Sequence, residues 1–232
     1  MGQVSQSDQV GKIIVPGPEK SRRLFLRKSA AMAVMGTTAA MLLRVTPARA
    51  DDGRHKYNKQ GVNFDSIRQH ENDHVDFLVN ALGSDARPMP TFQNLKQKNI
   101  IDFVMVSQAL ENTGVGAYLG AAPAIKDRDY LAAAGTIAFI EARHAGYLNV
   151  LVEDPITGSI IDLTSDNSFE TPLTPDQVAG YAGPFVADLN GGPPLTYSNT
   201  RSDDNDIAIL NFALALEYLE SEFYNINVPK FF

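Results

Sequence analysis

Two pairs of residues share a spacing that can bring a carboxylate and an imidazole to one point. Glu71 precedes His74 by three positions, and Glu141 precedes His144 by the same interval. On an α-helix, residues three apart lie on one face about one turn apart. The chain has only four histidines, and two of them stand in these pairs. Each pair can therefore offer two ligands to the same metal ion.

Two further stretches each carry a single glutamate within an apolar, helix-forming run. Glu111 is followed seven residues later by Tyr118, and Glu217 by Tyr224. An ionised carboxylate among apolar side chains is costly unless it is paired or bound to a metal. Two Glu-x-x-His helices and two single-glutamate helices make up the inventory of a carboxylate-bridged dimetal site in a four-helix bundle.

The predicted ligand set combines four carboxylates with two imidazoles, and either Glu71 or Glu141 would bridge two ions. Oxygen donors with a few nitrogens suit iron or manganese better than copper. The predicted cofactor is thus two iron or manganese ions, and the alternative is a bundle whose glutamates lie on solvated faces. The proposed metal ligands are Glu71, His74, Glu111, Glu141, His144 and Glu217.

Four other side chains near these motifs need an interpretation. Tyr118 and Tyr224 lie two turns from their glutamates, so each either hydrogen-bonds a ligand on a neighbouring helix or is an ordinary core tyrosine. Glu220 is either an additional ligand or a carboxylate beside the ligands or at the surface. His70 is rotated about 100° from Glu71 around the helix axis, so we do not expect it to be a ligand.

The elements that must position these residues are four long helices. Apolar residues at three- and four-residue steps predict helices over residues 64–82, 99–119, 127–151 and 204–224. Asn63 or Asp65 is expected to cap the first helix. Gly114 and Gly116 indicate either close packing at the second helix or a local break in it. We therefore predict an all-α four-helix bundle over residues 63–232.

A long irregular connection precedes the last helix. Residues 154–202 are rich in Gly, Pro, Asn, Asp, Ser and Thr, with a short helix expected from Pro175 to about Tyr181. A segment of this length without a long helix is unusual in a compact domain. We expect it to pack over the bundle and cross from one end to the other.

The first fifty residues have the features of a targeting segment. Arg22 and Arg23 begin a stretch that resembles a twin-arginine (Tat) signal, and Ala48 and Ala50 form a cleavage-type pattern. The apolar run between them, residues 29–43, is shorter than the roughly 20 residues needed to span a bilayer. The alternative is a membrane anchor. We expect a signal over residues 1–50, a flexible lead-in over 51–62, no stable membrane insertion after cleavage, and export to the periplasm or an equivalent space.

Composition narrows the classes of function. Cysteine is absent, which excludes disulfides, thiolate metal sites and cysteine nucleophiles. Residues 51–232 hold 12 Lys or Arg and 25 Asp or Glu, a formal net charge of −13. Binding of nucleic acid needs a basic face, so such a partner is not expected.

The motifs together resemble the ferritin-like superfamily, and more closely its desiccation-related ferritin-like family. The resemblance lies in residues 70–75, 110–120, 140–145 and 209–220. In that family the helix that matches residues 211–224 comes first, whereas here it comes last. The order indicates a circular permutation, which a bundle with adjacent ends tolerates. The alternative is helix exchange, in which the last helix completes the bundle of a neighbouring subunit in a homo-oligomer.

The primary hypothesis is an exported redox protein with a bridged diiron or dimanganese centre that reacts with dioxygen or hydrogen peroxide, as an oxidase or a catalase-like enzyme; the resemblance itself names no substrate. A non-catalytic stress or desiccation-related structural protein is the main alternative. Iron storage is a third possibility, although it needs a hollow cage that the 154–202 segment disfavours.

Overall fold

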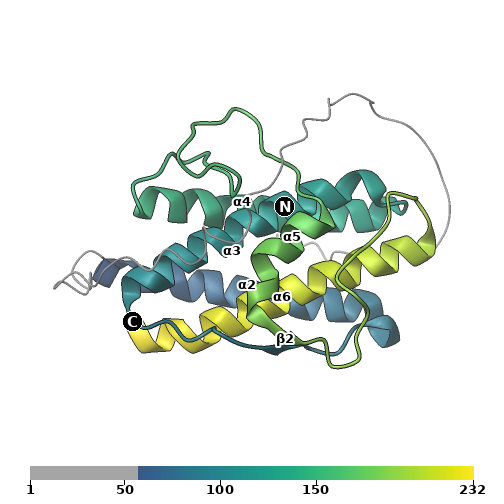
Figure 1. Ribbon diagram of the computed structural model, residues 1–232, viewed down its shortest axis with the longest axis horizontal. Helices are drawn as coiled ribbons and strands as arrows, with labels where there is room; N and C mark the ends of the chain where they lie inside the picture. Colours follow the sequence, from purple (N-terminus) through teal and green to yellow (C-terminus); the bar gives the residue numbers. More distant parts are fainter. Residues whose placement is uncertain (1–56) are drawn as a thin grey trace, which may run out of the picture. The chain divides into compact units, whose positions relative to one another are not determined.

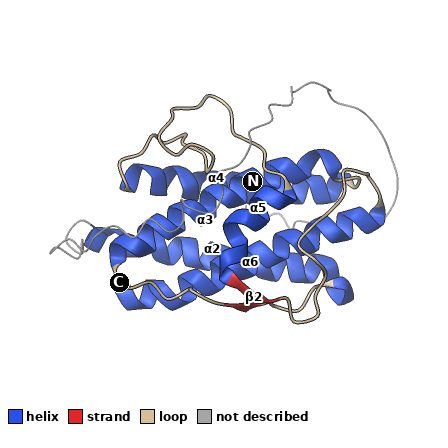
Figure 2. Ribbon diagram, viewed as in Figure 1, coloured by secondary structure: helices blue, strands red, loops and turns tan. Residues whose placement is uncertain are grey.

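The computed structural model describes residues 57–232, apart from the side chain of Asn58, and nearly all of its regular structure is helical (Figures 1 and 2). The expected signal (1–50), and residues 51–56 of the expected lead-in, lie outside this range. Within it, the prediction of an all-α bundle is confirmed. The four long helices are α2 (Gly61–Leu82), α3 (Ile100–Ala121), α4 (Arg128–Leu151) and α6 (Asp203–Phe231).

Polar side chains cap three of these helices at the expected starts. The side chain of Asn99 accepts the backbone N–H of Asp102 at the start of α3. Asp127 caps α4 and Ser202 caps α6 in the same way. Each cap satisfies a backbone donor that the first helical turn leaves unpaired. The helices therefore begin within one residue of their predicted starts.

The start of α2 differs from the prediction. The helix begins at Gly61, directly after a 3₁₀ turn over Asn58–Gln60, and Gln60 provides no side-chain cap. Neither Asn63 nor Asp65 is the cap, and residues 57–62 are not a flexible lead-in. The reason is packing, since the side chain of Tyr57 is buried in the main core.

The last helix also extends seven residues beyond its predicted end and contains Pro229 near its C-terminus. Pro229 lacks the backbone N–H that would bond the carbonyl of Asn225, so it removes one helical hydrogen bond and crowds that turn. Phe231 stacks on Phe103, and Phe232 stacks on Phe64 with ring centroids 5.0 Å apart. These contacts stabilise the final turn against the local preference of Pro229 to end it.

The long helices pack in two pairs, α2 with α6 and α3 with α4, and α3 also contacts α6 (Figure 1). Phe64, Phe103, Phe223 and Tyr224 are fully buried at the centre of the largest hydrophobic cluster. The pairs present their glutamates and histidines to one another across the bundle.

The connection between α4 and α6 runs over the bundle, as expected. It contains α5 (Pro175–Ala182), which packs on α3, and β2 (Val186–Asp188), which pairs antiparallel with β1 (Thr91–Phe92). A Cβ on Gly120 would lie 1.9 Å from the backbone oxygen of Leu173, and one on Gly116 would lie 2.6 Å from the Leu173 side chain. Gly116 and Gly120 therefore allow the segment around Leu173 to pack directly on α3. The helix continues through both glycines without a break.

No helix among residues 57–232 is both long enough and apolar enough to span a membrane.

Candidate metal centre

The four long helices bring all six predicted ligands into the interior of the bundle. Glu71 and His74 come from α2, Glu111 from α3, Glu141 and His144 from α4, and Glu217 from α6. The four carboxylates are at most 1% exposed, and the two imidazoles are 6–9% exposed. The three-residue spacing therefore has the geometric effect expected of it, because both members of each pair face inward.

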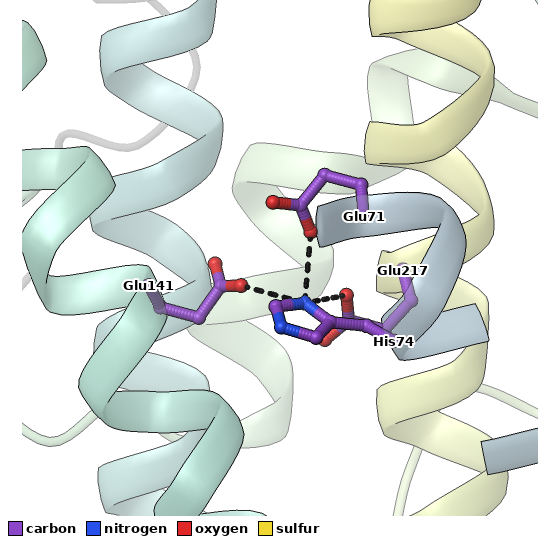
Figure 3. Close-up of side chains that lie close together, drawn as sticks. All are labelled: Glu71, His74, Glu141 and Glu217. Atoms are coloured by element: carbon purple, nitrogen blue, oxygen red, sulfur yellow. Dashed lines mark hydrogen bonds and ion pairs between the residues drawn. The ribbon is translucent and has the colours of Figure 1, made fainter. Parts of the chain in front are cut away.

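His74 lies among three of the carboxylates (Figure 3). Its Nδ1 is 3.1 Å from Glu71 Oε2, 3.2 Å from Glu217 Oε2 and 3.3 Å from Glu141 Oε1. One nitrogen can donate to only one of these oxygens at full strength. The convergence of three acceptors on one donor is the geometry of groups arranged around a shared centre.

His144 has the corresponding place in the other half of the bundle. Its Nδ1 is 3.0 Å from Glu111 Oε2 and 3.0 Å from Glu71 Oε1. The two oxygens of Glu71 thus face different histidines, Oε1 toward His144 and Oε2 toward His74. This is the disposition of a carboxylate that bridges two positions.

The two tyrosines hold the single glutamates reciprocally. Tyr118 on α3 donates to Glu217 Oε1 on α6 at 2.5 Å, and Tyr224 on α6 donates to Glu111 Oε1 on α3 at 2.6 Å. Of the two roles considered for them, the structure shows the hydrogen bond to a carboxylate on the neighbouring helix. These two reciprocal hydrogen bonds between α3 and α6 indicate that an approximate twofold axis relates the two halves of the bundle.

The buried oxygens of the centre are not satisfied by the protein alone. Glu71 Oε1 and Glu141 Oε1 lie 3.0 and 3.3 Å from the Nδ1 atoms of His144 and His74 without forming a hydrogen bond, and Glu141 Oε2 and Glu220 Oε2 are also buried without a hydrogen-bond partner. Two overlapping groups of four have ligand atoms within 4.8 Å of one another, one containing His74 and Glu217, the other Glu111 and His144. Both groups include Glu71 and Glu141, so the chemistry of this buried donor set fits metal ions.

The protonation equilibria reflect this concentration of charge. Burial, followed by the charge of Glu111, raises the pKa of Glu71 to about 7. Burial and the neighbouring carboxylates raise the pKa of Glu141 well above its ordinary value. Burial alone would lower the pKa of His144, but the carboxylates of Glu111 and Glu71 raise it to about 11. Without cations, the centre therefore retains protons to limit its negative charge.

Glu220 is a further buried acidic group beside the six predicted ligands, and its position corrects the idea of a surface carboxylate. It is 3% exposed, and burial and then Glu141 raise its pKa well above the ordinary value. A Cβ on Gly114 would be 2.7 Å from Glu141 Oε2 and 3.5 Å from Glu220 Oε1. Gly114 thus makes room for both carboxylates. Two features of the sequence could have indicated that Glu220 is buried. Glu220 follows Glu217 by three residues and so shares its helix face, and a glycine on α3 leaves room for a carboxylate.

His70 lies beside the centre although its predicted direction pointed elsewhere. It is exposed, and its Nδ1 is 3.0 Å from His144 Nε2, with the two rings parallel at 5.2 Å. It is not among the residues grouped around the cation positions. The expectation that it is no ligand agrees with this geometry, but its contact with His144 was not foreseen, because it depends on how α2 and α4 approach.

A helical bundle with a buried carboxylate–histidine cluster is typical of ferritin-like proteins. A family model described as a ferritin-like domain matches residues 44–154, which include α2, α3 and α4. The chain is thus similar to ferritin-like proteins over these residues, and α6, with Glu217 and Glu220, lies beyond the matched residues. The comparisons with curated proteins and with solved structures each find no match.

Proposed function

We propose that the centre binds two iron or manganese ions and carries out redox chemistry on dioxygen or hydrogen peroxide. The observation that supports this most directly is the pair of overlapping ligand groups that share Glu71 and Glu141. Four carboxylates and two neutral imidazoles carry four negative charges, which two divalent ions balance. When bound, such a metal pair supplies electrons and open coordination positions for an oxidant.

The protein's own groups have three tasks in this proposal. The carboxylates of Glu71 and Glu141 would hold both ions, because each belongs to both ligand groups. The hydroxyls of Tyr118 and Tyr224 orient Glu217 and Glu111, as the hydrogen-bond partners of metal ligands commonly do. Burial of all four ligand carboxylates excludes bulk water, which strengthens every charge interaction inside.

A small apolar pocket lies between α3 and α6, beside the tyrosine that hydrogen-bonds Glu217. Its lining includes Ala117, Tyr118 and Ala121 of α3 together with Ala213 and Leu216 of α6. Tyr118 is the polar member of this lining, and its hydroxyl touches Glu217. Dioxygen and hydrogen peroxide are small and uncharged, so a pocket of this kind admits them more readily than ionic substrates.

Export and family membership complete the proposal. Arg22 and Arg23 support transport of the folded protein by the twin-arginine route, with metal acquired beforehand. The proposal also places the protein in the desiccation-related group, with the first helix of that group moved to the end of the chain. The contact between the C-terminal end of α6 and the N-terminal end of α2 supports this helix order. Gly61 at the start of α2 lies against Phe232, which directly follows α6. A short loop could join them there.

Metal content tests the core of this proposal. The mature protein would be purified after native export, and iron and manganese would be measured by elemental analysis. We expect about two ions per chain, and loss of both in a Glu141→Ala, His144→Ala double variant. A Tyr197→Phe variant is the matched control, because this tyrosine packs edge-on against Phe212 outside the ligand groups. Absence of metal from folded wild-type protein would refute the dimetal centre.

Turnover separates the catalytic role from the alternatives. Protein loaded anaerobically with Fe²⁺ or Mn²⁺ would be mixed with dioxygen or hydrogen peroxide, and consumption of the oxidant would be followed. Repeated turnover supports the redox enzyme. Two tightly bound ions without turnover would leave the structural, stress-related protein. Large shells with many irons per chain would indicate storage.

A further inference from the structure

His70 and His144 make a contact that the ligand set does not require. The Nδ1 of His70 and the Nε2 of His144 are 3.0 Å apart, so one nitrogen donates a proton and the other accepts it. The other nitrogen of His144 faces Glu111 and Glu71, each at 3.0 Å. His144 is therefore held on both sides, by carboxylates toward the interior and by an imidazole toward solvent.

The inward nitrogen determines which partner donates. For His144 Nδ1 to give its lone pair to a cation, the ring proton must be on Nε2. His70 Nδ1 is then the acceptor, and the proton of His70 is on its own Nε2.

The two halves of the centre differ at this point. His70 directly precedes Glu71 on α2, and the residue that directly precedes Glu141 on α4 is Ile140. Ile140 therefore has the position on α4, relative to its Glu-x-x-His pair, that His70 has on α2. An imidazole acceptor can support His144, whereas an aliphatic side chain in the equivalent place offers His74 no such acceptor.

We propose that His70 is a positioning residue that fixes the ring of His144 with Nδ1 toward the interior, so that the cation position at His144 is the tighter of the two. This inference rests on the proposed dimetal centre. A hydrogen-bond acceptor on the outer nitrogen of a ligating histidine orients the ring and raises its basicity. The two ions would then bind in sequence, first at His144 and then at His74.

Two substitutions of His70 separate its hydrogen bond from its ring. His70→Asn retains an acceptor close to the place of Nδ1 and loses the stacked ring. His70→Phe retains a stacked ring and loses the acceptor. His70 is exposed, so both variants are expected to fold. Gln69→Ala, an exposed neighbour on the same helix whose side chain bonds Asp73, is the matched control.

Titration of the metal-free proteins with Mn²⁺, followed by the electron paramagnetic resonance of the free ion, measures both affinities. Wild type and Gln69→Ala should show a tighter and a weaker step. His70→Phe should weaken the tighter step by about tenfold to a hundredfold and leave the weaker one unchanged, and His70→Asn should stay near wild type. Equal steps in wild type, or identical isotherms for wild type and His70→Phe, would overturn the proposal.

A second readout does not depend on bound metal. In ¹⁵N spectra of metal-free protein, His70 should have an unprotonated Nδ1, and His144 should have a proton on Nε2 that His70→Phe exposes to faster solvent exchange. Protonation of His70 Nδ1 would refute the proposed positioning. If these spectra agree but Mn²⁺ does not bind, the proposed function fails and the hydrogen bond stands, so the two failures can be told apart.

Discussion

At the scale of single residues, the centre depends on a glycine as much as on its acidic groups. Gly114 lies on α3 where the carboxylates of Glu141 and Glu220 approach the helix backbone. Any side chain at this position would compete with them for the same space. A glycine inside a helix costs about 0.5–1 kcal/mol of stability relative to alanine. Its presence here is explained by the space that it leaves for the two carboxylates.

We expect Gly114→Ala to displace Glu141, because the new Cβ would be 2.7 Å from its Oε2. Since Glu141 belongs to both ligand groups, affinity for both ions should fall, by about tenfold or more. Metal titration and elemental analysis measure this. Gly135→Ala is the control, because its Cβ would meet nothing within 4 Å. It should bind metal normally and gain about 0.5–1 kcal/mol of stability. Unchanged metal binding in Gly114→Ala would contradict this account.

The ligand-bearing residues show what could be predicted at this scale. The inward direction of Glu71, His74, Glu141 and His144 follows from helix periodicity alone. The environment of Glu220 does not, because a three-residue step fits both a buried and a surface carboxylate, and the gap at Gly114 decides between them. The contact of His70 depends on the separation and rotation of α2 and α4, which local spacing does not determine.

At the scale of elements, the junction between α4 and α6 is held by one buried carboxylate. Asp206, in the first turn of α6, accepts the backbone N–H groups of Lys126 and Asp127 at 2.7 and 2.8 Å. Asp127 in turn caps α4. The start of the helix that carries Glu141 is thereby fixed to the start of the helix that carries Glu217.

Asp206→Ala should leave two backbone donors unpaired, at a cost of about 1–3 kcal/mol each. The thermal midpoint measured by circular dichroism should fall clearly. Asp204→Ala is a control in the same helical turn, because Asp204 is exposed. It loses only a favourable charge at the helix start, worth about 0.3–1 kcal/mol. Similar losses in both variants would mean that the junction contributes little.

The elements were predicted well where a local signal decides and poorly where tertiary packing decides. Asn99, Asp127 and Ser202 are cap residues directly before apolar periodic runs, and these starts agree to within one residue. The end of α6 was wrong because Pro229 is a local stop signal, whereas Phe231 and Phe232 gain their packing only from α2 and α3. The start of α2 was wrong for a similar reason, the burial of Tyr57.

At the scale of the whole molecule, the buried acids couple stability to pH. Without metal, the pKa of Glu71 is raised from 4.5 to about 7, and those of Glu141 and Glu220 are raised as well. The folded state thus keeps protons that the unfolded chain releases above pH 4.5. His144, raised from 6.5 to about 11, acts with the same sign at higher pH. Each contribution is fully present below the unfolded pKa and is lost as pH rises through the folded pKa.

The thermal midpoint of metal-free protein should therefore fall steadily from pH 5 to pH 9. Bound cations replace the protons, so loaded protein should lose less stability over the same range. Calorimetry of both forms measures the two slopes. Glu220→Gln removes one buried acid, and its metal-free form should show a shallower fall than wild type. A metal-free midpoint that rises with pH would contradict the sign of these shifts.

The order of the helices leads to a prediction about the entire chain. If α6 corresponds to the first helix of related proteins, its C-terminal end should lie where a loop to α2 would begin. Gly61 and Phe232 are in contact, with a Cβ on the glycine 3.2 Å from Phe232 Cβ. Helix connections in bundles usually take about 2–8 residues. A rearranged chain can therefore begin at residue 203, run through a linker of that length from Phe232 to Tyr57, and end at residue 202.

We expect this rearranged chain to fold and to bind the same number of ions as the natural order. Every ligand, both tyrosines and the pairing of α2 with α6 remain in place, while the only covalent bond lost is the one between Ser202 and Asp203. That break separates Ser202 from the helix that it caps, which should cost about 0.5–2 kcal/mol. Circular dichroism and elemental analysis measure the outcome.

As a control, a chain with new ends between Gly114 and Val115 would divide α3 beside the centre and should lose metal binding. Failure of the first chain to fold would show that the present helix order is itself required, and would argue against a simple permutation.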